Sequence, residues 1–177
     1  MGVPLVLDFG RDRAQDVSDA GHLAMQELVL RLGRGAGMAP RFELATKPAE
    51  PWRSSDVALA NERHRLLIGV ECWNDIGDVG ASSRSSTRKE AELDAHAVAR
   101  WGPDGGARHV WVVRATARNR DLVARYPEVF AARFPGSSRA WVEALTTGGE
   151  PPEEPGLVWC EVGATRLYEW RQREERR

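Results

Sequence analysis

Residues 54–73 read SSDVALANERHRLLIGVECW, and this stretch decides the fold. Residues 54–60 and 65–73 each have the composition of a strand, and the polar residues 61–64, NERH, separate them as a turn. Two strands joined by so short a turn form an antiparallel hairpin. The second run is almost entirely apolar, which predicts a strand that is buried on both of its faces.

Helical and extended segments alternate around this hairpin. The pattern predicts a helix capped by Ser18 or Asp19, then a strand, the hairpin, a second helix and a fourth strand. These flanking elements are expected at about 19–32, 41–47, 84–101 and 108–116. The resulting order for residues 19–116 is helix, three strands, helix, strand, which is typical of an α/β (α+β) protein with a mixed central sheet flanked by helices.

The remaining residues continue the same domain. Short helices are expected from about 118, 127 and 139, followed by a hairpin formed by LVWCEV and RLYEW. We therefore expect one domain over 1–177, with a core at 19–116, a helical and hairpin extension at 117–170 and a solvated tail at 171–177. The role of residues 1–17 is left open.

Composition narrows the class of protein. The 177 residues carry a formal net charge of −1, so no bulk attraction to nucleic acid is expected. No apolar run approaches the roughly 20 residues that cross a bilayer, and no secretory signal is apparent, so we expect a cytoplasmic protein without a membrane partner. Cys72 and Cys160 match no zinc spacing, and the four histidines match no metal motif; we expect buried thiols and structural or exposed histidines.

Two acidic residues occupy related positions in the central hairpin. Asp56 opens the first strand and Glu71 lies near the end of the second; pairing through the NERH turn puts them nearly opposite, with Cβ atoms about 5 Å apart. Two carboxylates this close are costly unless they share a proton or bind a cation. Hard oxygen ligands suit Mg²⁺ or Mn²⁺, and the backbone carbonyl of Cys72 is a further candidate ligand.

These residues and the order of elements carry a family resemblance. Residues 19–116, with Asp56 opening one strand and Glu71 in the next, resemble the PD-(D/E)-x-K nuclease superfamily, which has the restriction-endonuclease-like fold. The resemblance implies Mg²⁺- or Mn²⁺-dependent hydrolysis of DNA. It implies that Asp56 and Glu71 hold the metal, that a lysine orients the attacking water, and that Glu27 is the candidate for an assisting acid on the first helix.

The chain departs from the family motif at two positions. Ser55 stands where the motif has proline, and Trp73 stands where it has the lysine. In some family members that lysine has moved to the following helix, which makes Lys89 the catalytic candidate; it is one of only two lysines, Lys47 and Lys89, among 25 cationic residues. Three arginines are candidate phosphate-binding residues: Arg84, Arg88 and Arg114.

Residues 118–145 and 155–162 also look like the C-terminal part of actinobacterial helix-turn-helix regulators. Two hypotheses from different classes follow. In the first, the protein is a metal-dependent nuclease with DNA as its partner. In the second, it is an inactive nuclease-fold module that binds DNA, a regulatory protein or a second copy of itself. Apart from both hypotheses, each residue has a purely structural alternative: Asp56 caps or edges a strand, Glu71 pairs with an arginine, and Lys89 is a solvated helix charge.

Overall fold

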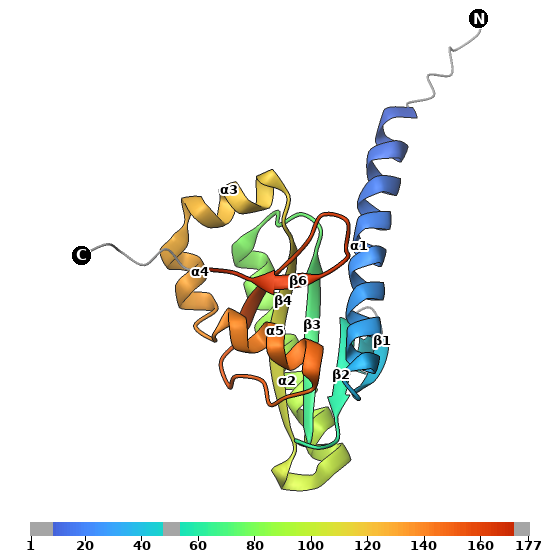
Figure 1. Cartoon of the computed structure of the whole chain (residues 1–177), viewed down its shortest axis with the longest axis vertical. Coiled ribbons are helices and arrows are strands. Elements are labelled where there is room, and N and C mark those ends of the chain that lie inside the picture. Colours follow the sequence, from blue (N-terminus) through green and yellow to red (C-terminus); the bar gives the residue numbers. More distant parts are fainter. Residues whose placement is uncertain (1–8, 48–53, 172–177) are drawn as a thin grey trace, which may run out of the picture.

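The computed structural model describes the backbone of residues 9–47 and 54–171, and the side chains of these ranges from residue 20 onward. Figure 1 shows a mixed α/β architecture in which these residues form five α-helices and six strands. In chain order the elements are α1 (Phe9–Gly35), β1 (Ala39–Ala45), β2 (Ser54–Asn61), β3 (Leu66–Trp73), α2 (Val79–Trp101), a 3₁₀ turn (Gly102–Asp104), β4 (Gly106–Arg114), α3 (Ala117–Arg125), α4 (Pro127–Arg133), α5 (Ser138–Thr147), β5 (Gly156–Cys160) and β6 (Leu167–Glu169).

All six strands belong to one open sheet in the order β1-β2-β3-β4-β5-β6. β1, β2 and β3 are antiparallel neighbours, β3, β4 and β5 run parallel, and β6 returns antiparallel to β5. The predicted order of helix, three strands, helix, strand is confirmed, and the mixed sheet is confirmed with it. The predicted C-terminal hairpin is also present, and β5 extends the central sheet by pairing with β4.

Helices cover both faces of the sheet, so the protein has three layers. On one face, α1 and α5 pack through residues such as Leu28 and Trp141 against Val57, Val110 and Val158. On the other face, α2 places Leu93 and Ala97 on the small side chains of β2 and β4, and α4 packs Phe130 and Phe134 against Trp111. Burial of these two apolar faces is the main stabilisation of such a layered domain.

The central hairpin has the predicted register. Val57 pairs with Val70 and Ala60 with Leu67, so the residue numbers of each pair sum to 127, as they do for 56 and 71. All of β3 except Trp73 is buried, which confirms the prediction of a strand covered on both faces. The predicted strands of the core lie within two residues of the observed ones.

Both long helices begin earlier than predicted. α1 begins at Phe9, so Ser18 and Asp19 are interior helical residues and the cap predicted there is wrong. α2 begins at Val79 because Asp78 caps it: the carboxylate of Asp78 accepts a hydrogen bond from the backbone N–H of Ala81 at 2.9 Å. Residues 79–83, which precede the predicted start at 84, are therefore helical.

Several smaller expectations are also settled. Cys72 and Cys160 are both buried free thiols, as predicted. Within the described ranges no helix is long and apolar enough to span a bilayer. The predicted tail at 171–177 lies outside the described residues except for Arg171, and residues 1–8 lie outside them as well.

Candidate functional site: an acid pair and a lysine beneath α2

The two candidate metal ligands lie at the end of the hairpin that is opposite its turn. The paired ladder between β2 and β3 ends at Val57 and Val70, and Asp56 and Glu71 are the next positions along. There the Oδ2 atom of Asp56 accepts a hydrogen bond from the backbone N–H of Cys72 at 2.7 Å. The Asp56 carboxylate thus bonds directly to β3, and its side chain is 23% exposed.

Glu71 is held from two directions. The Nζ atom of Lys89 donates to Oε2 of Glu71 at 2.6 Å, and the hydroxyl of Ser55 donates to Oε1 at 3.2 Å. The Glu71 side chain is only 5% exposed and that of Lys89 is 16% exposed. The contact expected from the position of Lys89 on the second helix is therefore present, and the alternatives of an arginine partner for Glu71 and a solvated Lys89 are wrong.

The packing of α2 explains why this lysine reaches the acid. Leu93 lies one helical turn after Lys89 and is fully buried in the cluster that joins α2 to β2, β3 and β4. Gly69 permits this close approach, since a Cβ atom there would lie 2.3 Å from Cδ1 of Leu93. With Leu93 fixed over Gly69, the preceding turn carries Lys89 over Glu71, two residues further along β3.

Burial changes the protonation of Glu71. Loss of solvent raises the pKa of this carboxyl, the Lys89 ammonium opposes that shift, and the nearby Asp56 carboxylate raises the pKa further; the result is a pKa of about 7. Glu71 is thus poised between the charged and neutral forms at neutral pH. Such a shift, produced by burial together with specific charged neighbours, is common at functional sites.

The carbonyl of Cys72 faces the same side as the acid pair. In a strand, the N–H and C=O groups of one residue point the same way across the sheet. The Cys72 N–H points toward Asp56 on β2, so the Cys72 carbonyl also points toward β2. Within the part of the chain that the structure describes, no hydrogen bond reaches the second Asp56 oxygen, Oδ1. Asp56 and Cys72 therefore offer oxygen atoms in the same region.

Sequence reasoning missed one residue at this site. Nε2 of His22, on α1, lies 3.7 Å from Oδ2 of Asp56, and the imidazole is 34% exposed. Glu27, the acid expected from this helix, is exposed instead, because five helical residues place it about 140° around the axis from His22. The expectation that Glu27 assists the acid pair is not met by this geometry, and His22 occupies the place where a side chain of α1 reaches the pair.

Within the described ranges, none of the three candidate phosphate-binding arginines forms a hydrogen bond or ion pair with Asp56 or Glu71. Arg114, at the end of β4, donates from Nε to the carbonyl of Val162 and from Nη1 to Oδ1 of Asn74, both at 2.8 Å. Arg84 and Arg88 are exposed on α2 and line a hollow beside α4. They lie on a different side of α2 from Leu93, whose face packs against the sheet.

His109 is a further buried titratable group close to this site. It pairs in register with Gly69, is 1% exposed, and neither ring nitrogen has a hydrogen-bond partner within the described ranges. Burial, together with the positive charges of Arg133 and Lys89, lowers the pKa of His109 to about 3. The imidazole is therefore neutral at physiological pH.

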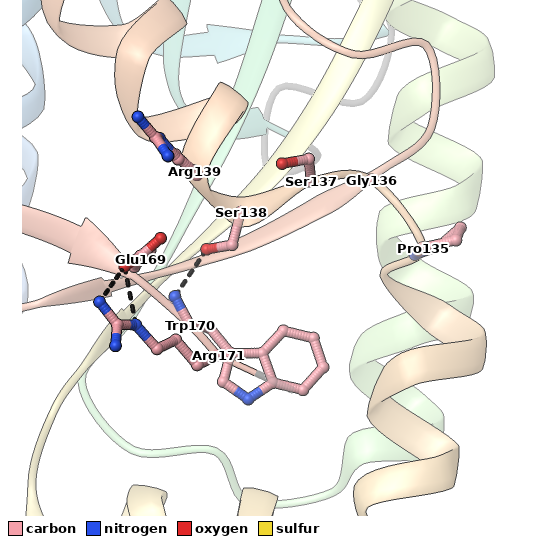
Figure 2. Close-up of a pocket in the computed structure, with 8 residues that line it drawn as sticks. All are labelled: Pro135, Gly136, Ser137, Ser138, Arg139, Glu169, Trp170 and Arg171. Carbon is pink, nitrogen blue, oxygen red and sulfur yellow. Dashed lines mark hydrogen bonds and ion pairs between the residues drawn. The ribbon is translucent and has the colours of Figure 1, made fainter. Parts of the chain in front are cut away.

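A hollow of the described structure lies elsewhere, around the start of α5 and the residues after β6. It has a volume of about 620 Å³ and is lined by Pro135, Gly136, Ser137, Ser138, Arg139, Glu169, Trp170 and Arg171. Figure 2 shows that Arg171 bonds to Glu169 and that the Ser138 hydroxyl accepts from the backbone N–H of Trp170. Much of its polar lining is thus already satisfied, and none of the candidate site residues belongs to it.

Two further observations bear on the site. Among the side chains described, no group of three or more histidine, cysteine, aspartate or glutamate residues is arranged to hold a metal ion. Comparison with protein-family models, with curated proteins and with solved structures finds no match to this chain. The function therefore has to be inferred from the geometry of the site itself.

Proposed function

We propose that the protein is a divalent-metal-dependent nuclease that hydrolyses phosphodiester bonds in DNA. Asp56 and Glu71 serve as metal ligands in this proposal, and Lys89 positions the attacking water. The observation that supports it most strongly is the 2.6 Å contact between Lys89 and Glu71 beside Asp56. The three residues that the resemblance to PD-(D/E)-x-K nucleases selects come from two strands and a helix. Lys89 contacts Glu71, and Asp56 bonds to the backbone of Cys72, the residue after Glu71.

The candidate metal ligands are all oxygen atoms, the donor type that hard cations prefer. Two carboxylates and the Cys72 carbonyl supply oxygen atoms, which Mg²⁺ and Mn²⁺ prefer, and Mg²⁺ usually keeps several water ligands beside one or two carboxylates. Both oxygens of Glu71 already accept hydrogen bonds, so this residue would have to give up its contact with Lys89 or Ser55 to bind a metal directly. A bound Mg²⁺ or Mn²⁺ would supply a more acidic water and would stabilise negative charge on the phosphate.

Lys89 has the chemistry for the positioning role. Its ammonium group has three donors, one of which is used by Glu71, and the side chain is 16% exposed. The remaining donors can hold a water molecule or a phosphate oxygen next to the acid pair. A cation at this point also favours the negatively charged transition state of phosphodiester hydrolysis.

His22 is an additional candidate in this proposal. Its imidazole lies 3.7 Å from the Asp56 carboxylate and is one-third exposed, and a ring N–H can donate to that carboxylate. Its role would be to move a proton or to orient Asp56, which is the part that the resemblance assigns to an acid on the first helix.

A plasmid and single-stranded DNA cleavage assay tests the proposal. With Mg²⁺ or Mn²⁺ the wild-type protein should nick DNA, and Asp56→Asn, Glu71→Gln and Lys89→Met should each lower the rate by about 10²-fold or more. Asp104→Asn removes an exposed carboxylate that is paired with Arg65, so it is a matched control and should cleave normally. Wild-type protein that stays inactive with both ions, or variants that cleave like the wild type, would contradict the proposal.

One observation favours the second hypothesis, a catalytically inactive module that binds DNA, a regulatory protein or a second copy of the chain. Glu71 and Lys89 neutralise each other in a nearly dry environment, as a purely structural ion pair would. In that case neither metal ion should raise the melting temperature, and Asp56→Asn should leave partner binding unchanged.

A further inference from the structure

An open hollow of about 520 Å³ lies between α2 and the end of α4. Three of its six lining residues are arginines and two carry hydroxyl groups. The lining residues are Ser83, Arg84, Thr87, Arg88, Ala91 and Arg133. The three arginines thus come from two helices and border one concave surface, to which their side chains contribute mainly apolar atoms.

Arg133 is held in place from the protein side. Its guanidinium carbon lies 5.4 Å from the centroid of the Phe134 ring, and Nη2 is 3.5 Å from the hydroxyl oxygen of Thr87. Its Nε atom is buried and has no hydrogen-bond partner within the described ranges. Burial also lowers the pKa of Arg133, and Glu90 opposes that shift from a distance beyond ion-pair range. A fixed, partly desolvated cation of this kind favours an anionic ligand.

Arg84 and Arg88 add two further guanidinium groups to the hollow. They are four residues apart on α2 and so lie on the same side of the helix, where like charges repel. Within the described part of the chain, no carboxylate lies within 4 Å of Arg84, Arg88 or Arg133. Elsewhere on the surface, in contrast, Arg65, Arg100 and Arg118 each form an ion pair. An anion in the hollow would relieve this repulsion.

We propose that the hollow formed by Arg84, Arg88 and Arg133 binds the phosphate groups of a nucleic-acid backbone. Guanidinium groups bind phosphate through paired N–H donors, and Ser83 can add a hydroxyl donor. Because the hollow is open and two of its arginines project along the exposed face of α2, a polyanion that follows the helix fits it better than a small enclosed anion. The choice of nucleic acid rests on the proposed function, but the binding itself requires neither metal nor cleavage.

Fluorescence anisotropy with labelled single-stranded and duplex oligonucleotides, in EDTA, tests the inference. Wild-type protein should bind, and Arg84→Gln/Arg88→Gln should weaken binding at least tenfold. The dependence of log affinity on log salt should become shallower by about 0.7–0.9 for each phosphate group that the variant no longer neutralises. Arg133→Gln should weaken binding as well, and Arg84→Lys/Arg88→Lys should restore part of it.

The control is Arg41→Gln/Arg63→Gln, which changes the net charge equally at two exposed arginines of β1 and the β2–β3 turn. It should bind like the wild type. The inference is overturned if the control loses as much affinity as Arg84→Gln/Arg88→Gln, or if wild type fails to bind oligonucleotide while inorganic phosphate binds. Wild-type protein that binds oligonucleotides but does not cleave DNA would refute the proposed function alone. Wild-type protein that cleaves DNA, with unchanged oligonucleotide binding in the arginine variants of the hollow, would refute only this inference.

Discussion

Of the two acids in the candidate site, Glu71 is the one whose environment changes its protonation. It lies in an environment that excludes water, touches one cation and one hydroxyl, and has a second carboxylate nearby. Its pKa of about 7 lies above the ordinary value of 4.5, so the folded protein holds a proton there that the unfolded chain releases. Folding is therefore linked to pH through this one group.

We predict that Glu71→Gln removes this linkage. The stabilisation from protonated Glu71 is complete below pH 4.5 and is lost as the pH rises through the range from 4.5 to about 7. Relative to Glu71→Gln, the wild-type free energy of unfolding should fall by on the order of 2 kcal/mol between pH 5 and pH 8. Urea unfolding of both proteins at several pH values measures this. Parallel pH profiles for the two proteins would show that Glu71 titrates normally.

His109 has the opposite linkage. Burial and nearby positive charge lower its pKa to about 3. Below pH 6.5 the unfolded chain therefore binds a proton at this imidazole that the folded protein does not bind. The stability contributed by the neutral imidazole is present above pH 6.5 and is lost as the pH falls toward 3.

His109→Leu should therefore protect the protein against acid. Relative to the variant, the wild type should lose on the order of 2 kcal/mol of unfolding free energy between pH 8 and pH 5. Because both ring nitrogens are buried and, within the described ranges, have no hydrogen-bond partner, the substitution should be nearly neutral or stabilising at pH 8. Acid unfolding followed by circular dichroism, with His64→Leu as a control at a less buried histidine, provides the measurement. An unchanged acid midpoint in His109→Leu would argue against this account.

At the scale of elements, the hairpin was the most predictable part of the site. A four-residue polar turn between two apolar runs fixes the register, and counting along both strands from this turn brings Asp56 and Glu71 to the same end of the hairpin, one position beyond the last observed pair, Val57 and Val70. The reach of Lys89 was predictable for a similar reason, since its spacing from Leu93 puts it on the buried face of α2.

Other parts of the site depend on contacts between distant segments. His22 and Glu27 lie on the same helix, and only the way α1 packs on the sheet decides which of them reaches Asp56. Arg84 and Arg88 lie in the first turns of the predicted second helix, and the residues before them are helical too because Asp78 caps the helix and Ser82 and Ser86 pack inward. No local pattern contains this information, because tertiary packing overrides weak helix propensity.

α1 and α5 meet at a glycine, and this contact gives a prediction for the face of the sheet opposite the site. Gly148 ends α5 with φ of 76°, and a Cβ atom there would lie 2.2 Å from the backbone oxygen of Ala36. Gly148→Ala should lower the free energy of unfolding by about 2–5 kcal/mol, through the left-handed conformation and the steric clash together.

Gly149→Ala is the matched control for this change, because a Cβ atom at Gly149 would meet only the Thr147 hydroxyl, at 3.5 Å. It should cost less than about 1 kcal/mol in the same urea titration. Equal losses in the two variants would mean that the contact between Gly148 and Ala36 does not constrain the protein.

At the scale of the whole molecule, the sheet brings together residues far apart in sequence. β2 and β3 contribute the two acids, α2 contributes the lysine from one face, and α1 contributes His22 at the edge. Since β3 and β4 run parallel, the long α2 must connect them, and this connection carries Lys89 back over the strand that holds Glu71. The site therefore exists only in the assembled three-layer domain.

Direct measurement of Mn²⁺ binding by electron paramagnetic resonance tests the central claim, that Asp56 and Glu71 together hold a divalent ion. The wild-type protein should bind one Mn²⁺ per chain and compete for it with Mg²⁺. Asp56→Asn, which keeps an oxygen acceptor for the Cys72 N–H, should abolish binding, whereas Asp104→Asn should bind as the wild type does. Equal Mn²⁺ binding by wild type and Asp56→Asn, or none by either, would contradict the account.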